Sequence, residues 1–87
     1  MNQTKMINDV KAVKNSVFIQ EAGGDYVALH YDSEIFRASS DGENYEVKNL
    51  YVPSVTSSKM AKRCYEYVFG ITLEPKAWKQ LKERFNQ

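Results

Sequence analysis

The chain has 87 residues, of which 43% are hydrophobic and 26% are charged, and these globular proportions argue against a disordered protein. No apolar run approaches the ~18 residues that a membrane-spanning helix needs, so we do not expect an integral membrane protein. A chain of this length has room for one hydrophobic core and can rarely spare apolar side chains for an enclosed active-site cavity. We therefore expect a single domain over residues 1–87.

The first predicted element is a helix over about residues 4–14. Apolar side chains recur there at helical spacing, with lysines between them: Met6, Ile7, Val10 and Val13. Asn15 and Ser16 should end this helix, because both side chains compete with it for backbone hydrogen bonds.

An antiparallel meander is predicted between residues 16 and 52, where the hydrophobic period changes to two. Three or four strands are expected, around Val17–Ile19, Tyr26–Tyr31, Glu34–Ser39 and Tyr45–Val52. The turns between them are expected at Ala22–Asp25, Asp32-Ser33 and Asp41-Gly42.

Two helices are predicted after Pro53, where the period returns to 3.6. The cap of the first is expected at one of three residues: Thr56, Ser57 or Ser58. Its apolar stripe contains Met60, Cys64 and Val68, so Cys64 should be buried, and Gly70 should end it in the left-handed conformation. The second helix should begin near Glu74-Pro75 and bury one apolar face: Ala77, Trp78, Leu81 and Phe85.

The predicted order of elements is thus α-β-β-β-β-α-α, an α+β fold with its helices on one side of an antiparallel sheet. Cys64 is the only cysteine, which excludes an intramolecular disulfide, and the sequence shows no export signal at its start. These two features predict a cytoplasmic protein.

No catalytic constellation is recognisable. His30 is the only histidine and Cys64 the only cysteine, and nothing in the sequence supplies the orienting group and oxyanion donors that such a pair would need. One Cys and one His are too few for a zinc site, and the acidic residues lack the spacing of a calcium loop. The sequence therefore predicts a protein that is not an enzyme and that holds neither a metal nor a cofactor.

Charge is segregated along the chain. Residues 15–52 hold seven acidic and two basic side chains, whereas residues 53–87 hold seven basic and three acidic ones. Such asymmetry influences steering and the choice of partner.

Two candidate surfaces follow from this segregation. A protein-binding surface is expected on the sheet, because exposed tyrosines suit interfaces and carboxylates steer association. Its candidates are Tyr26, Tyr31, Asp32, Glu34, Asp41 and Glu43. The alternative is a nucleic-acid-binding surface on the C-terminal helices, with the candidates Lys59, Lys62, Arg63, Lys76, Lys79 and Lys82.

The segment Ser58-Lys59-Met60-Ala61-Lys62-Arg63 resembles the start of the second helix in double-stranded-RNA-binding domains, whose pattern is Ser-Lys-Lys-x-Ala-Lys. In that family the lysines contact phosphates across the major groove. The resemblance implies the same role for Lys59 and Lys62. The family's Gly-Pro-x-His loop is missing from this chain.

The predicted architecture is similar to that of small phage-encoded inhibitors such as some anti-CRISPR proteins, which block nucleic-acid-handling complexes by surface contact without catalysis. This resemblance implies a non-catalytic inhibitor or adaptor, encoded by a phage or mobile element, that docks on a protein or nucleoprotein partner. Binding of double-stranded RNA or DNA through the basic helices is the alternative.

Overall fold

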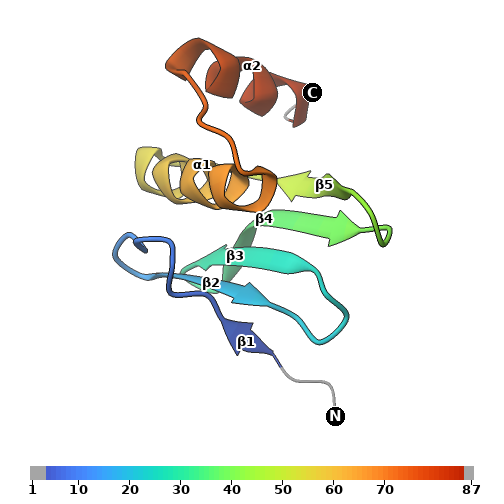
Figure 1. Ribbon diagram of the computed structural model, residues 1–87. Coiled ribbons are helices and arrows are strands. Elements are labelled where there is room, and N and C mark those ends of the chain that lie inside the picture. The colour runs from blue at the N-terminus through green and yellow to red at the C-terminus, as the bar shows by residue number, and fades with distance from the viewer. Residues whose placement is uncertain (1–3, 86–87) are drawn as a thin grey trace.

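The computed structural model describes residues 4–85 and consists of one antiparallel sheet with two helices (Figure 1). In chain order, the elements are β1 (Lys5–Met6), β2 (Ser16–Gln20), β3 (Tyr26–His30), β4 (Ser33–Ser40), β5 (Tyr45–Leu50), α1 (Val55–Phe69) and α2 (Pro75–Phe85). The strands are hydrogen-bonded in the order β1-β2-β3-β4-β5, each antiparallel to the next. The expected α+β class and the meander are therefore confirmed.

The expected helix over residues 4–14 is wrong. Lys5 and Met6 instead form a short fifth strand that pairs with Gln20 and Ile19, and the amide of Ile7 donates to the carbonyl of Phe18 over 2.9 Å. An isolated helix of this length is marginal because nucleation is costly, whereas pairing with β2 satisfies backbone groups of residues 5–7 directly. The apolar residues that suggested a helix still reach the core from an irregular segment: Ile7, Val10 and Val13.

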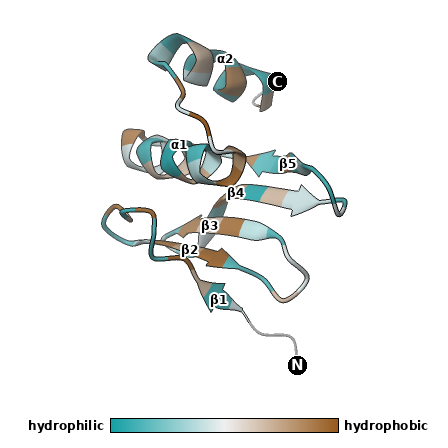
Figure 2. Ribbon diagram, in the orientation of Figure 1, coloured by the Kyte–Doolittle hydropathy of each residue, from teal (hydrophilic) through white to brown (hydrophobic). Residues whose placement is uncertain are grey.

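The hydrophobic core lies between one face of the sheet and α1, which contacts β2, β3, β4 and β5 (Figures 1 and 2). A row of side chains crosses four strands in register: Phe18, Ala28, Phe36 and Leu50. Buried side chains of α1 pack against this face: Met60, Ala61 and Cys64. Cys64 is fully buried, as its place in the apolar stripe predicts.

A bulge in β4 increases what this strand contributes to the core. The pairing of β3 with β4 shifts between Ala28 and Leu29, so that Ile35 has no strand partner in the register. A bulge can place two successive side chains on the same face. Ile35 and Phe36 are accordingly both buried in the core.

Helix α1 begins earlier than its sequence indicates. Its N-cap is Ser54, whose hydroxyl accepts from the Ser57 amide while the Ser57 hydroxyl accepts from the Ser54 amide. This reciprocal arrangement satisfies two backbone donors at once, so Ser57 supports the cap and is not the cap itself. Gly70 ends the helix at φ 64°, in the left-handed conformation expected for it.

Helix α2 lies beside α1, on the β5 side of the molecule (Figure 1). The connection is held by the Glu66 carboxylate, which accepts from the Leu73 amide over 2.7 Å. Trp78 is only 6% exposed, as expected for the centre of the apolar face of α2, whereas Phe85 is exposed at its end. Neither helix in residues 4–85 is long and apolar enough to cross a membrane.

Candidate functional site

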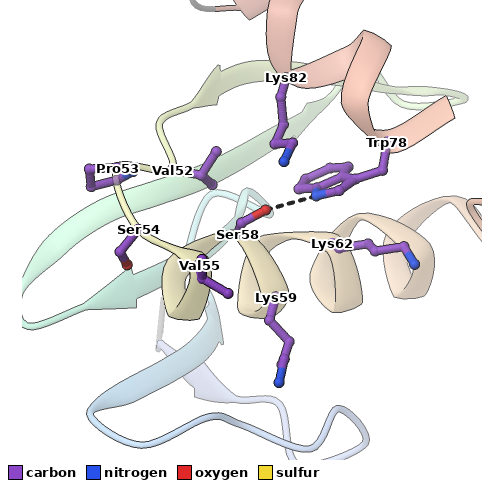
Figure 3. Close-up of a pocket in the computed structure, with 9 residues that line it drawn as sticks. All are labelled: Val52, Pro53, Ser54, Val55, Ser58, Lys59, Lys62, Trp78 and Lys82. Carbon is purple, nitrogen blue, oxygen red and sulfur yellow. Dashed lines mark hydrogen bonds between the residues drawn. The ribbon is translucent and has the colours of Figure 1, made fainter. Parts of the chain in front are cut away.

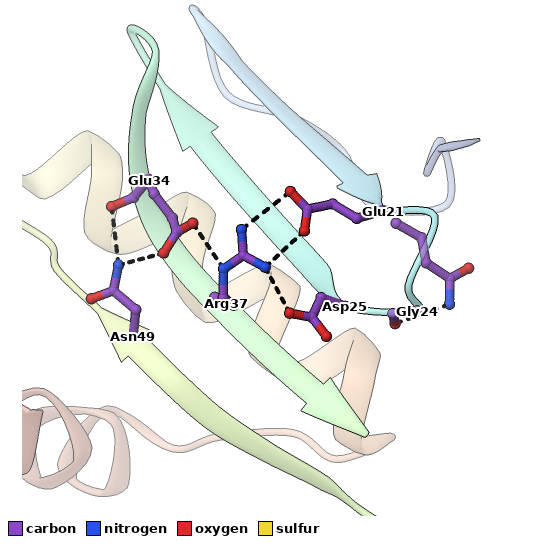
Figure 4. Close-up of polar contacts among 7 residues, drawn as sticks. Glu21, Gly24, Asp25, Glu34, Arg37 and Asn49 are labelled. Carbon is purple, nitrogen blue, oxygen red and sulfur yellow. Dashed lines mark hydrogen bonds and ion pairs between the residues drawn. The ribbon is translucent and has the colours of Figure 1, made fainter. Parts of the chain in front are cut away.

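The acidic side chains on the open face of the sheet are largely engaged by one arginine. Because Phe36 faces α1, strand alternation places Arg37 on the opposite face, where it contacts three carboxylates (Figure 4). Its guanidinium donates to Glu21 at 2.8 Å, to Asp25 at 2.6 Å and to Glu34 at 2.9 Å. These charged hydrogen bonds raise the pKa of Arg37, and the bond from Arg37 lowers the pKa of Glu21.

Both carboxylate oxygens of Glu34 therefore have hydrogen-bond partners within the protein. Its second carboxylate oxygen accepts from the Asn49 side-chain amide over 2.8 Å, so β4 and β5 are linked by the same network (Figure 4). A carboxylate with two internal partners would have to break them before it could meet another protein.

The other residues of the proposed protein-binding surface are dispersed. Tyr31 and Asp32 form the β3–β4 turn, while Asp41 and Glu43 belong to the β4–β5 turn at the opposite end of β4. Tyr26 lies on the helix-covered side in an aromatic cluster with Phe18, Tyr45 and Tyr67. Its burial raises the pKa of its hydroxyl. The structure therefore does not bring these six candidates together.

Three of the six basic candidates line one surface pocket. Lys59 and Lys62 of α1 and Lys82 of α2 line a surface pocket of about 550 Å³ between the two helices (Figure 3). The remaining walls come from the segment that joins β5 to α1 and from both helices: Val52, Pro53, Ser54, Val55, Ser58 and Trp78. We call these nine residues the lysine pocket.

The lysines of the lysine pocket form no ion pair within residues 4–85. None of the nine residues that line the pocket is acidic. The first turn of α1 also contains no acidic residue, so the partial positive charge of that helix end adds to the field of the lysines.

Four of the nine residues that line the pocket are apolar: Val52, Pro53, Val55 and Trp78. Val55 is 83% exposed at the first position of α1, beside Val52 and Pro53. Trp78 forms the side towards α2, and the Lys82 ammonium lies 5.9 Å from its ring centroid, within the range of a cation–π contact. Pro53 and Val55 therefore place exposed apolar surface next to the charged side chains.

The other three basic candidates lie elsewhere. Arg63 donates to the backbone carbonyl of Lys11 over 2.8 Å and so holds the irregular segment between β1 and β2 against α1. Lys76 and Lys79 are exposed on α2 and do not line the pocket. The six basic candidates, which the sequence does not distinguish, therefore fall into three that line the pocket and three that do not.

His30 and Cys64 occupy unrelated settings. Burial raises the pKa of the Cys64 thiol, which disfavours the reactive thiolate. The His30 ring is hydrogen-bonded to the Ser16 hydroxyl, with 2.8 Å between Nδ1 and Oγ, at the end of the β2–β3 pair. Among residues 4–85, no three His, Cys, Asp or Glu side chains are grouped to hold a metal ion.

Most of the residues that form the pocket walls could not be predicted from the sequence. Val52, Pro53 and Ser54 looked like the end of a strand and a helix boundary, and their meeting with Trp78 depends on how α2 packs. The one available signal was the run from Val52 to Ser58, which combines apolar residues with a helix start that lacks acidic side chains.

No protein-family model matches the sequence, and comparison with curated proteins and with solved structures finds no significant relative. The candidate site therefore depends on the geometry of this chain alone.

Proposed function

We propose that this protein is a non-catalytic binding module, an inhibitor or adaptor, that docks through the lysine pocket on an acidic surface of a partner protein. One observation carries the proposal: Lys59, Lys62 and Lys82 line one open, largely apolar hollow with no acidic residue among its walls. Uncompensated charge of one sign in a concave site attracts ligands of the opposite sign and accelerates their association.

The acidic sheet supports this role less well than its sequence suggests. Its central carboxylates are paired with Arg37, and its outer ones lie at opposite ends of β4. An interface usually depends on a few anchoring residues near its centre, surrounded by others that exclude water. The lysine pocket instead brings apolar side chains and cations together at one place.

Nucleic-acid binding is the second candidate, because Lys59 and Lys62 line the same pocket and Lys59 matches the first lysine of the RNA-binding pattern. Phosphate recognition would use all the exposed lysines of the two helices, including Lys76 and Lys79. A protein ligand would instead depend only on the pocket lysines. This difference allows one pair of variants to separate the two functions.

The pocket variant combines Lys59→Glu, Lys62→Glu and Lys82→Glu. The control variant combines Lys14→Glu, Lys76→Glu and Lys79→Glu, which makes the same change of net charge at exposed sites outside the pocket. Each protein is immobilised and used to capture partners from cells that produce it. The captured protein is then purified and its dissociation constant is measured directly.

We expect the wild-type protein and the control variant to bind this partner and the pocket variant to lose it, with or without nuclease treatment. Equal binding by both variants would contradict the proposal. Loss of binding after nuclease treatment, together with weakening in both variants, would favour the nucleic-acid function.

A further inference from the structure

We infer that the ligand of the lysine pocket is a short acidic peptide segment with one large apolar side chain, which enters the hollow while its flanking carboxylates meet the lysines. This inference rests on the proposed function and deepens it, because it names the chemistry of the partner segment. Its two components, an apolar anchor and flanking negative charge, follow from separate features of the pocket.

The apolar anchor follows from the walls. Val52, Val55 and Trp78 border a hollow of about 550 Å³, within the size range of small-ligand sites. Val55 is 83% exposed although it stands at a helix terminus where a polar residue would serve equally well. An apolar side chain inserted here would cover it and remove both partners from water.

The flanking carboxylates follow from the placement of the cations. Figure 3 shows Lys82 reaching from α2 towards α1, and Lys59 and Lys62 extending outward from α1. Long flexible side chains of this kind keep their stems on apolar surface while their ammonium groups stay at the rim. Carboxylates on both sides of an inserted side chain would therefore meet a lysine on each helix.

The lysine pocket is poorly suited to binding a nucleic acid. Phosphates gain nothing from the apolar walls, and a base has no aromatic face on which to stack, because Trp78 is 6% exposed with Lys82 across its ring. A membrane with anionic lipids would supply charge and apolar contact, but a flat surface cannot fill a hollow between two helices. A peptide side chain can.

Trp78 is the only tryptophan of the chain, so its fluorescence reports directly on the pocket. The probe is the peptide acetyl-Glu-Glu-Leu-Glu-Glu-amide, titrated at low salt and again at higher salt. Matched peptides replace the central leucine with alanine or each glutamate with lysine. We expect the leucine peptide to produce a saturable change of Trp78 fluorescence that weakens as salt rises.

Because burial of a leucine side chain changes affinity by about 10- to 100-fold, the alanine peptide should bind at least ~10-fold more weakly. The lysine peptide should not bind. Calorimetry with the variants then locates the site: the pocket variant should lose the leucine peptide, and the control variant should retain it.

A wall substitution tests the anchor separately. Val55→Ser should weaken the leucine peptide and leave the alanine peptide unchanged, while the matched change Val17→Ser, an exposed valine of β2, should alter neither. Circular dichroism confirms that each variant is folded.

Equal affinity for the leucine and alanine peptides would overturn the inference. Tighter binding of a 20-base-pair RNA or DNA duplex, or of vesicles with equal phosphatidylserine and phosphatidylcholine, would also overturn it. If no peptide binds but a captured protein is still lost from the pocket variant, the inference fails and the proposed function stands.

Discussion

The indole Nε1 of Trp78 donates a hydrogen bond to the Ser58 hydroxyl over 2.9 Å, and this contact joins the two helices at the lysine pocket (Figure 3). Twenty residues separate the two partners in the sequence. Because Trp78 is also buried against Tyr65, its position fixes how α2 sits beside α1. Lys82, one turn further along α2, is thereby held over the opening of the pocket.

Trp78→Ala should severely destabilise the protein. Truncation of a buried aromatic side chain costs about 3–5 kcal/mol, a large share of the free energy of unfolding of a small domain. Urea denaturation followed by circular dichroism measures the loss. An unchanged midpoint would mean that α2 does not depend on this side chain for its docking.

Tyr31→Asn should stabilise the protein by roughly 0.5–1 kcal/mol. Tyr31 and Asp32 form a two-residue hairpin loop with φ values of 51° and 68°, a conformation that asparagine and glycine adopt more easily than tyrosine. Thermal denaturation of the variant measures the gain. A lower melting temperature would instead show that the bond from the Asn15 side-chain amide to the Tyr31 hydroxyl outweighs the strain.

The Arg37 network should make stability depend on pH through Glu21. The bond from Arg37 lowers the pKa of Glu21 below its ordinary value of 4.5, so this carboxylate stabilises the folded state above that pH. The stabilisation is lost as the pH falls through the lowered pKa.

Glu21→Gln should therefore reduce the free energy of unfolding at pH 7, and the difference from the wild-type protein should shrink below about pH 4. Denaturation at a series of pH values checks this, with Glu43→Gln, a change in the exposed β4–β5 turn, as the control. A constant difference across the series would contradict the assigned role of Glu21.

Cys64→Ser and His30→Gln should preserve binding whenever the variants fold. The buried thiol has a raised pKa, so iodoacetamide should modify native Cys64 far more slowly than it modifies the unfolded chain. Mass spectrometry measures the two rates. Fast modification of the native protein would contradict the burial of Cys64, and lost function in a folded Cys64→Ser variant would count against a non-catalytic role.

The sequence predicted the parts of the fold that local patterns determine. The strands of the meander, the burial of Cys64 and Trp78 and the helix end at Gly70 follow from hydrophobic period and turn chemistry. The first element was wrong because the apolar spacing around Ile7 fits a helix, whereas pairing with β2 makes Lys5–Met6 a strand and the residues after it are irregular. Such tertiary pairing is invisible to a local pattern.

The candidate site was predicted less completely for a similar reason. Lys59, Lys62 and Lys82 were among the basic candidates, but their place around one pocket depends on the docking of α2 against α1. In the sequence, Glu34 looked like a free surface carboxylate. Its partner Arg37 follows three residues later, and residues three apart lie on opposite faces of a regular strand. The bulge in β4 allows the two side chains to meet.

Chemical-shift mapping with the captured partner tests the central claim most directly. The partner is added to the ¹⁵N-labelled protein, and backbone amides and the Trp78 indole are followed. We expect the largest shifts at the Trp78 indole and over residues 54–62, with little change in the turns at Tyr31 and Asp41. Shifts concentrated in those turns, with the Trp78 indole unmoved, would contradict the assignment of the lysine pocket as the binding site.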